Sequence, residues 1–259
     1  MRDKSQKIPI SVAIITKDEA HNLPRCLSSV AFADQIVVVD SGSTDGTLEI
    51  AQAFGCDVFR EPWRGGFGAQ KQFAIDQCHH DWVLVLDADE SIPDATAAAI
   101  ACIVEAPDDS IAGYSFPRKN FFQDRWIRHA GWWPDRIVRL FRREMGGMSA
   151  AAVHEGVEVR GRLSPLEVPL EHFTESRLSK ILQKIDRYST LGAQEAFASG
   201  RRSSSGAALV RAVLTFFQDY FLRLGILDGA PGLTLAVTDS VNKFFKYAKL
   251  AEMSRKNRK

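Results

Sequence analysis

Short runs of apolar residues alternate with helix-like stretches over the first hundred residues of the chain. Four of these runs are rich in β-branched or large apolar residues: Ser11–Thr16, Gln35–Asp40, Cys56–Phe59 and Trp82–Leu86. Continuous apolar runs of this kind are typical of strands that are covered on both faces. Helical patterns near residues 20–31, 46–54, 67–78 and 93–105 lie between and after them. The pattern predicts an α/β fold, in which helices flank a mostly parallel, Rossmann-like sheet.

The pattern changes after residue 110. Further strands are predicted at residues 113–117, 136–141 and 157–160, separated by irregular, aromatic-rich segments. From Leu178 onward the pattern predicts helices, one with an apolar stripe through Leu209, Val213 and Phe217, and a last one at 234–253 after a break at 225–232. We therefore expect an α/β domain over residues 1–175 and a basic, amphipathic helical appendage over residues 176–259.

Composition adds one asymmetry to this picture. The 259 residues are 45% hydrophobic, which is enough for one large domain with an appendage. The net charge of +1 conceals a basic C-terminal region, since residues 177–259 hold fifteen Lys or Arg against six Asp or Glu. This balance favours an anionic partner, either a membrane surface or nucleic acid, although a solvated helix face would look the same. No nucleic-acid recognition motif accompanies it.

Two further features bear on location. No run reaches the roughly 18 uncharged apolar residues that a membrane span requires. The four cysteines lie more than twenty residues apart without a Cys-x-x-Cys pair, which is typical of reduced thiols in a cytosolic protein and argues against a zinc site. We therefore expect a cytoplasmic protein that associates with the membrane only at its surface.

Three of the predicted strands end in polar or acidic residues. The first runs into Thr16-Lys-Asp-Glu19, the second into Asp40-Ser-Gly-Ser-Thr-Asp-Gly46 and the fourth into Asp87-Ala-Asp-Glu90. In open α/β sheets, ligands bind outside the carboxyl ends of the strands. We therefore expect these three segments to form one site.

The acidic triplet at the fourth strand predicts a metal. Three carboxylates in four residues repel one another unless a cation neutralises them. Mg²⁺ and Mn²⁺ are bound by one or two carboxylates together with substrate phosphates. Asp-x-Asp alone occurs in many surface turns. After a buried strand, and beside the acidic strand end at Asp40, it predicts a metal–nucleotide site.

The same segments carry a family resemblance. Ser11-Val-Ala-Ile-Ile-Thr-Lys-Asp-Glu-Ala20, Val37-Val-Val-Asp-Ser-Gly-Ser-Thr-Asp-Gly-Thr47 and Leu86-Asp-Ala-Asp-Glu90 resemble the family-2 glycosyltransferases of the GT-A fold over about residues 9–160. Arg139-Leu-Phe-Arg142, His154-Glu155 and the segment from Phe217 to Lys249 are similar to the bacterial lipopolysaccharide-core β-glucosyltransferase subgroup. Asp18-Glu19-Ala20 departs from the more usual Asn-Glu-Glu, so the role of position 18 stays open.

The resemblance implies a role for residues of each motif. Asp40 is expected to hold the nucleotide base or ribose, with Thr16 and Glu19 beside it. Asp87 is expected to contact the ribose or a metal-bound water, and Asp89 to ligate the metal that bridges the diphosphate.

Three basic residues are further candidates. Lys71 matches a basic position near the nucleotide, although a solvated helix lysine would give the same sequence. Arg139 and Arg142 alternate with Leu140 and Phe141, and we expect them to share one strand face. They would meet a phosphate there, or form structural salt bridges.

A carboxylate must accept the proton of the acceptor hydroxyl in an inverting transfer. Glu155 is one candidate, and His154 before it would complete the metal shell or bind the diphosphate. Asp135 is the rival, because Trp132 and Trp133 beside it could stack on a sugar face. A base outside this set is the third alternative.

The resemblance implies an inverting, metal-dependent glycosyltransferase. It would move a sugar, glucose as the first guess, from a UDP-sugar to a hydroxyl of a lipopolysaccharide-core or other lipid-linked glycan. We expect peripheral attachment to the cytoplasmic face of the inner membrane, no nucleic-acid partner, and a homo-oligomer as one use of the C-terminal helices. One alternative is a sugar-phosphate nucleotidyltransferase, but its Gly-rich basic loop is replaced here by Thr16-Lys-Asp-Glu19. Another is a non-catalytic nucleotide-sugar-binding module, which the intact Asp87 and Asp89 disfavour.

Overall fold

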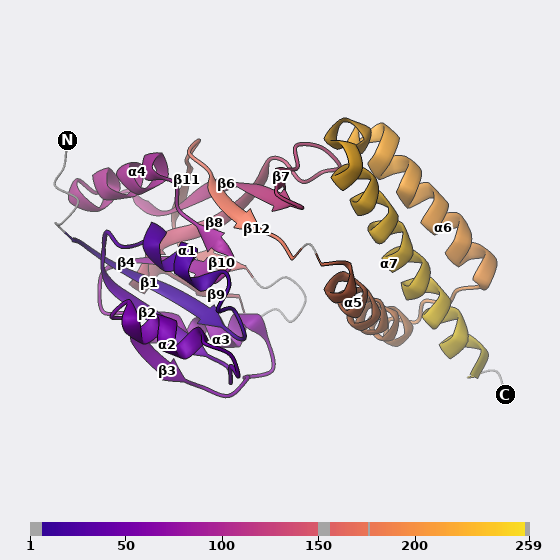
Figure 1. The fold of residues 1–259 in the computed structure, drawn as a ribbon, viewed down its shortest axis with the longest axis horizontal. Coiled ribbons are helices and arrows are strands. Elements are labelled where there is room, and N and C mark those ends of the chain that lie inside the picture. The colour runs from indigo at the N-terminus through magenta and orange to yellow at the C-terminus, as the bar shows by residue number, and fades with distance from the viewer. Residues whose placement is uncertain (1–6, 150–155, 176, 257–259) are drawn as a thin grey trace. The chain divides into compact units, whose positions relative to one another are not determined.

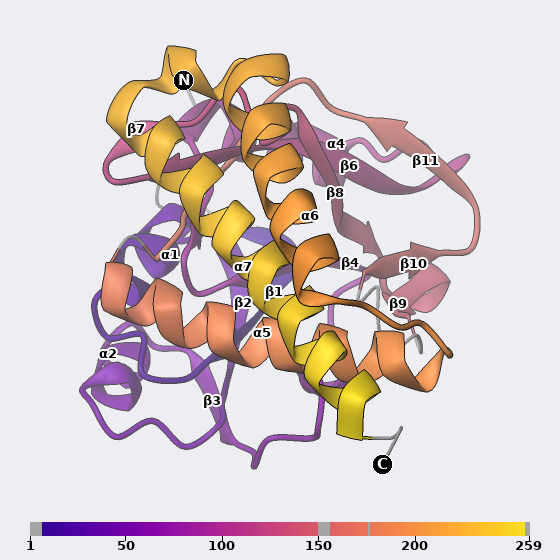
Figure 2. The same cartoon turned by 90° about the vertical axis from the view of Figure 1, so that its right-hand side faces the viewer.

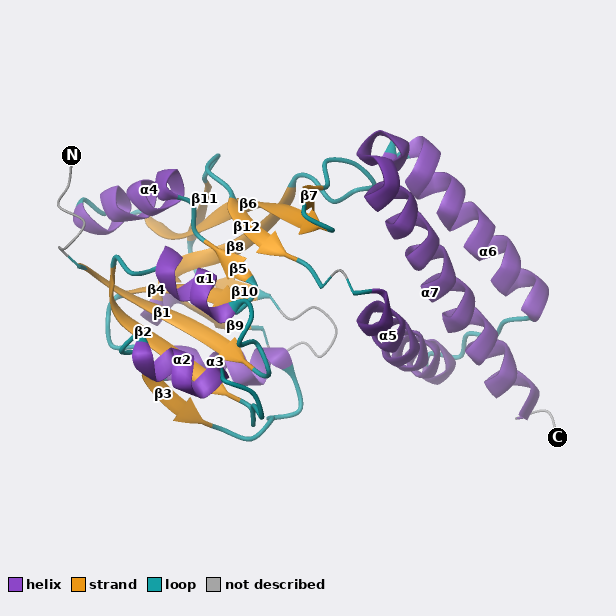
Figure 3. Ribbon diagram, in the orientation of Figure 1, coloured by secondary structure: helices purple, strands orange, loops and turns teal. Residues whose placement is uncertain are grey.

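The computed structural model describes residues 7–149, 156–175 and 177–256 (Figure 1). The chain divides into two compact units. Unit 1 comprises residues 1–118 and 135–172, and unit 2 comprises residues 119–134 and 173–259. Strands dominate the first and helices the second (Figure 3).

A mixed sheet of ten strands is the framework of unit 1. Its main path has the order β3-β2-β1-β4-β8-β6-β12-β5. The parallel half consists of β1 (Ile8–Thr16), β2 (Ala33–Asp40), β3 (Asp57–Arg60) and β4 (Trp82–Asp87). The remaining strands are β5 (Glu90–Ser91), β6 (Ile111–Phe122), β7 (Arg125–Trp126), β8 (Asp135–Arg142), β11 (Arg162–Pro165) and β12 (Leu170–Phe173). The two short strands β9 (Gly146–Met148) and β10 (Val157–Val159) pair with each other.

Alternate side chains of the central strands build a core on each face of the sheet. On one face, Ile14, Leu84 and their neighbours pack with the helices α1 (Leu23–Ser29), α2 (Thr47–Ala53) and α4 (Asp94–Glu105). On the other, Val83, Val85 and their neighbours pack with α3 (Phe67–Asp76) and with β9 and β10. Coverage of both faces explains why these strands are continuous apolar runs. The predicted α/β class, with flanking helices and a helical C-terminal region, is confirmed.

Unit 2 is helical apart from the hairpin of β6 and β7. Its elements are α5 (Leu178–Ala198), α6 (Ser205–Phe217), the π-helix η2 (Gln218–Leu222), the 3-10 helix η3 (Gly225–Asp228) and α7 (Gly229–Lys256). α7 runs beside α6 and packs across α5 (Figure 2). None of the described helices could cross a membrane by itself. Ser205–Leu222 and Gly225–Arg255, bent by 68° at their break, pass the length and composition test only as a pair.

Two boundaries differ from the sequence prediction. Residues 119–134 group with the helices rather than with the α/β domain, because Phe122 and Ile127 form a small core with Leu235 of α7. The last helix begins at Gly229, so the predicted break is shorter. Pro231 lies in the first turn of this helix, where a missing N–H costs no intrahelical hydrogen bond.

Candidate active site

The register of the central strands brings the three predicted segments to one edge of the sheet. Thr16 is paired with Asp40 across β1 and β2, and Ile15 is paired with Asp87 across β1 and β4. These pairs close the carboxyl ends of three adjacent parallel strands. The expected gathering of the strand ends is therefore present in unit 1.

Asp40 shapes the loop that follows β2. Its side chain is almost fully buried, and its Oδ2 accepts hydrogen bonds from the backbone N–H groups of Gly42 and Ser43, each at 3.0 Å. The Ser43 hydroxyl donates to Oδ1. Three acceptor positions of this carboxylate are thus used by its own loop. The expected contact of Asp40 with a base or ribose stays a prediction.

The loops after β1 and β2 are locked together. Asp18 adopts a left-handed conformation (φ 53°), and its Oδ1 accepts from the backbone N–H of Thr44 at 2.7 Å. In the other direction, the N–H of Glu19 donates to Oγ1 of Thr47 at 2.9 Å. An Asp tolerates this conformation, and its side chain ties one loop to the next.

Thr16 leaves a polar atom without a partner at this edge. The residue is 4% exposed, and its Oγ1 has no hydrogen-bond partner within the described part of the chain. Buried hydroxyl groups are nearly always hydrogen-bonded, so a hydroxyl left over at a strand end is typical of a ligand site.

Asp87 is held by two cations. Lys71 of α3 places its Nζ 2.6 Å from Oδ1, and Arg139 of β8 places its Nη2 2.8 Å from Oδ2. Burial by itself would raise the pKa of Asp87, but the opposing charges of Lys71 and Arg139 outweigh it and hold this pKa well below its usual range. The solvated-lysine alternative for Lys71 is wrong, because only 11% of its side chain is exposed.

Glu90 and Arg139 extend this network. The carboxylate of Glu90 is fully buried, and its Oε1 accepts from Nη2 of Arg139 at 2.7 Å and from Nη1 of Arg118 at 3.3 Å. Arg118 in turn donates to Oδ2 of Asp135 at 2.6 and 2.9 Å. Burial would lower the pKa of Arg139, but the charges of Glu90 and Asp87 raise it above its usual value. The guanidinium groups and Lys71 thus neutralise most of the acidic cluster that the sequence assigned to a metal.

Asp89 differs from its neighbours. Its Oδ2 lies 3.3 Å from Nε2 of His172 on β12, and both side chains are partly exposed, at 27% and 19%. Two cis ligands that are each about 2.1 Å from an octahedral ion lie about 3 Å apart. The spacing of this pair therefore fits a shared divalent ion. His172 has no ligand spacing in the sequence, and the pairing of β12 with β5 opposite Glu90 is what brings it here.

Arg142 does not belong to this site, and the predicted shared face with Arg139 is wrong. It is opposite Trp82, at the start of β4, whereas Asp87 ends that strand. Its Nη2 contacts Oδ1 of Asp109 at 2.8 Å. The physical reason is the period of a strand, because residues three apart point to opposite faces.

Four other predicted residues stay predictions as members of the site. His154 and Glu155 lie outside the described residues. Trp132 and Trp133 belong to unit 2, where the first packs on Phe122 and the second on Trp126. Asp135 is the one candidate base that the structure places within the network, paired with Arg118.

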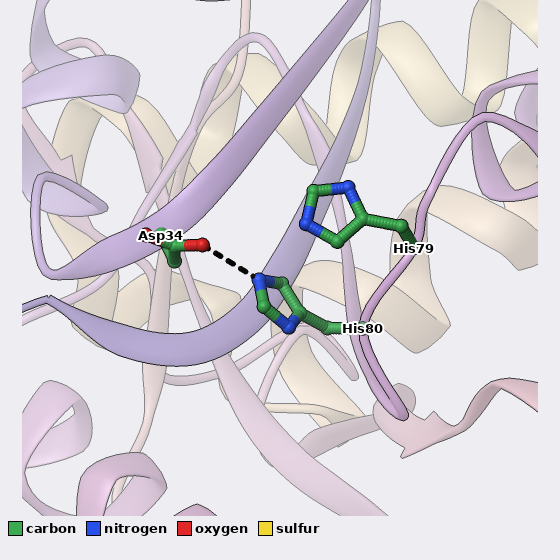
Figure 4. Close-up of side chains that lie close together, drawn as sticks. All are labelled: Asp34, His79 and His80. Atoms are coloured by element: carbon green, nitrogen blue, oxygen red, sulfur yellow. Dashed lines mark hydrogen bonds and ion pairs between the residues drawn. The ribbon is translucent and has the colours of Figure 1, made fainter.

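A separate group of possible ligands lies near the opposite ends of the strands. Asp34 near the start of β2 and the consecutive His79 and His80 before β4 bring one ligand atom each to within 4.8 Å of one another (Figure 4). Nε2 of His80 is 2.9 Å from Oδ2 of Asp34. This group is at the amino ends of β2 and β4 and takes no part in the site at their carboxyl ends.

A family model and related sequences assign the chain to one family. The model of glycosyl transferase family 2 matches residues 11–158. The lipopolysaccharide core biosynthesis glycosyltransferase LpsC of Rhizobium meliloti is 32% identical over 257 residues, which cover 94% of this chain and 92% of that protein. An uncharacterized glycosyltransferase of Rickettsia conorii is 27% identical, over 99% of this chain and 94% of its own. Among solved structures, glucosyl-3-phosphoglycerate synthase from Mycobacterium tuberculosis aligns with a TM-score of 0.47 at 18% identity, over 67% of this chain and 75% of that one.

Proposed function

The chain belongs to glycosyl transferase family 2, and from that premise we propose that it transfers a sugar from a UDP-sugar to a hydroxyl group of a lipid-linked glycan. The observation that carries the proposal is the pair of Asp89 and His172 beside the neutralised Asp87. Cations neutralise Asp87, whereas the carboxylate of Asp89 and the imidazole of His172 are partly exposed. This pair can bind a metal ion that assists the departure of a diphosphate.

The residues at this edge fit a divalent ion, Mg²⁺ or Mn²⁺. Asp89 and His172 would hold it, and His154, outside the described residues, is a further candidate ligand. Such an ion stabilises the negative charge of a departing diphosphate. Asp87, whose two oxygens contact Lys71 and Arg139, would act by orienting these two cations toward the nucleotide.

The first loop supplies the remaining donor contacts. The buried Oγ1 of Thr16 is free to hydrogen-bond a nucleoside, and the locked loops around Asp40 and Glu19 keep the backbone in place for it. Contacts that are already fixed before the substrate binds cost less conformational entropy on binding.

The proton acceptor is proposed to be Glu155, with Asp135 as the alternative. Oδ2 of Asp135 accepts two hydrogen bonds from Arg118, which engages this carboxylate in a structural contact before any acceptor arrives. We expect Glu155→Gln to reduce transfer much more than Asp135→Asn, while hydrolysis of the bound donor by water falls less. The reverse order would assign the base to Asp135.

The name of one relative supports a proposal for the acceptor. LpsC is named for lipopolysaccharide core biosynthesis, and it aligns with nearly the whole of this chain. We propose a core glycan on a lipid anchor as the acceptor, glucose as the first sugar to test, and a peripheral position on the cytoplasmic face of the inner membrane.

One experiment tests the enzyme assignment. Purified protein is screened against UDP-sugars, UDP-glucose first, by thermal shift and by donor turnover, with Mn²⁺ or Mg²⁺ and with EDTA. We expect metal-dependent stabilisation by one UDP-sugar and loss of turnover in Asp89→Ala. Asp109→Ala, which changes a carboxylate that is 94% exposed at the other end of the sheet, is the matched control. Unaltered turnover in Asp89→Ala would exclude the metal assignment.

A further inference from the structure

The large apolar side chains of α6 and η2 face the solvent. The buried residues of α6 are the small Ala208 and Ala212, which form its contact side. Six large apolar residues are each between 54% and 77% exposed: Leu209, Val210, Val213, Leu214, Phe217 and Leu222. We call these six residues the outer apolar face. The apolar stripe that the sequence predicts through Leu209, Val213 and Phe217 thus lies on the exposed side of α6.

A surface of this kind needs a cover. Single exposed apolar residues are normal, but contiguous apolar patches on a soluble protein mark a contact with another apolar phase or partner. The described parts of unit 2 leave these side chains exposed while α7 packs against the small residues of the same helix. An ordinary amphipathic helix packs its large apolar side chains against the core. α6 does the reverse, because it packs through small residues and exposes the large apolar ones.

The exposed charges in the chain segment that carries this face are all of one sign. Between residues 201 and 230, every residue of which the structure describes, the exposed charged residues are Arg201, Arg202, Arg211 and Arg223. The two acids in this stretch are buried: Asp219 pairs with Arg223, and Asp228 contacts His129. A second copy of this face would bring arginines against arginines, whereas an anionic surface would complement them.

A pocket lies at one end of unit 2. Residues 124–129 and η3 line a space of about 520 Å³, and its charged side chains are the exposed Arg125 and Arg128, Asp124, and the buried Asp228. The guanidinium of Arg128 lies 4.2 Å from the ring centroid of Trp126, and Nη2 of Arg125 donates to the carbonyl oxygen of Leu227 at 3.3 Å. Both arginines are exposed, and Leu227 itself is 58% exposed. Arginine forks of this type bind phosphate groups.

We propose that the outer apolar face is a membrane-docking surface, which enters the boundary between headgroups and acyl chains of an anionic bilayer while Arg125 and Arg128 contact lipid phosphates. Amphipathic helices with a cationic border bind bilayers in this way, with the apolar side about 5–10 Å deep. The inference rests on the proposed lipid-linked acceptor, because it gives the enzyme a way to stay at the surface where that acceptor is held.

One basic residue of the last helix is engaged within the protein. The ammonium of Lys249 contacts Oδ1 of Asp186 at 2.7 Å, Oγ1 of Thr190 at 2.7 Å and Oγ of Ser189 at 2.9 Å. This lysine therefore ties α7 to α5. Membrane affinity is expected to depend on the apolar face more than on the charge of the last helix.

Flotation of the full-length protein with vesicles tests the proposal. The vesicles are phosphatidylcholine alone, or phosphatidylcholine with phosphatidylglycerol. The triple variant Leu214→Ser, Phe217→Ser and Leu222→Ser is expected to lower the partition coefficient at least tenfold, which corresponds to about 1.4 kcal/mol. All three side chains are exposed, so the fold is expected to be retained, and circular dichroism checks this.

The matched control makes the same change on another helix. Leu178, Leu182 and Leu191 of α5 are 54%, 58% and 50% exposed, and their replacement by Ser should leave flotation unchanged. An equal loss in both variants would overturn the assignment of the surface to α6. Wild-type protein that stays with the aqueous fraction, or that forms a dimer which the triple variant abolishes, would overturn the membrane as the occupant.

The phosphate contacts have their own test. Arg125→Gln with Arg128→Gln is expected to lower binding to the phosphatidylglycerol vesicles about 30-fold, since each of the two basic residues near an anionic leaflet contributes about 1 kcal/mol. Binding to phosphatidylcholine alone should change little. Arg60→Gln with Arg162→Gln, at exposed positions of unit 1, is the control. An equal loss on both vesicle types would refute the role of the pocket.

Donor turnover separates this inference from the proposed function. All docking variants should hydrolyse the UDP-sugar at the wild-type rate in the absence of vesicles, because none of them lies in the site. Normal flotation with no turnover of any UDP-sugar would remove the proposed function and leave the docking surface standing. Normal turnover without flotation would leave the proposed function standing and remove the docking surface.

Discussion

The two aspartates of Asp87-Ala88-Asp89 are expected to respond very differently to the same substitution. Asp87→Asn removes the charge that faces Lys71 at 2.6 Å and Arg139 at 2.8 Å, and it leaves two buried cations with less compensation. Asp89→Asn removes a partly exposed carboxylate whose contact at 3.3 Å is the imidazole of His172. One variant tests stability and the other tests chemistry.

The magnitudes follow from burial. Removing one partner of a buried ion pair costs about 3–5 kcal/mol, and an isosteric amide at position 87 should lie near the lower value, about 3 kcal/mol. In a chain of this size that lowers the melting temperature by about 6–12 °C. The exposed pair at position 89 is worth at most about 1 kcal/mol, or a shift below about 4 °C.

Thermal unfolding followed by circular dichroism measures both shifts, and metal-dependent donor turnover is assayed below the melting point of each variant. We expect Asp87→Asn to be clearly destabilised, and Asp89→Asn to be nearly as stable as the wild type but without metal-dependent turnover. Asp109→Asn should change neither property. Equal destabilisation at positions 87 and 89 would refute the distinction between Asp87, which two buried cations hold, and Asp89, which is partly exposed beside His172.

Three further predictions concern ionisation and packing. Lys71→Met should raise the pKa of Asp87, because it removes one of the two cations that hold this pKa down. The stability gained from a depressed carboxyl pKa is present at neutral pH and is lost as the pH falls. Acid unfolding of the variant should therefore begin at a higher pH than that of the wild type. A ¹³C NMR titration and an acid-unfolding curve measure these two effects, and an unchanged carboxyl pKa would contradict the assignment. Burial raises the pKa of Cys78 to about 12, so the exposed Cys102 should react with Ellman's reagent while Cys78 reacts only on unfolding; equal rates in the folded protein would argue against the burial. Gly232→Ala should destabilise the protein by about 1–3 kcal/mol, since a Cβ there would lie 2.0 Å from a backbone carbonyl oxygen. Gly206→Ala, in open space within α6, should be neutral or stabilising. Calorimetry that ranks the two variants the other way would contradict the packing at the start of α7.

The sequence alone determined the central sheet and the location of the site. Periodicity is a local property, so the runs at Ser11–Thr16, Gln35–Asp40 and Trp82–Leu86 identify strands without knowledge of their partners. The rule that ligands bind at the carboxyl ends of parallel strands then places Thr16 and Asp87 at one edge. The structure agrees with each of these steps.

Local patterns failed where a face or a boundary had to be chosen. Arg142 was assigned to the face of Arg139, although an odd spacing in a strand separates them. The change from strand to helix pattern predicts the domain boundary near residue 175, but a local pattern cannot show that residues 119–134 share a small core with α7.

Only the tertiary structure decided what each acid does. Asp87 is neutralised by Arg139, more than fifty residues away, and Asp89 is paired with His172 through the return of β12 to the sheet. It also decided that α6 packs through its alanines and leaves its large residues outside. The physical reason is the same in each case: charge neutralisation and burial depend on groups that are distant in the chain, and a local pattern of apolar and acidic residues does not contain their positions.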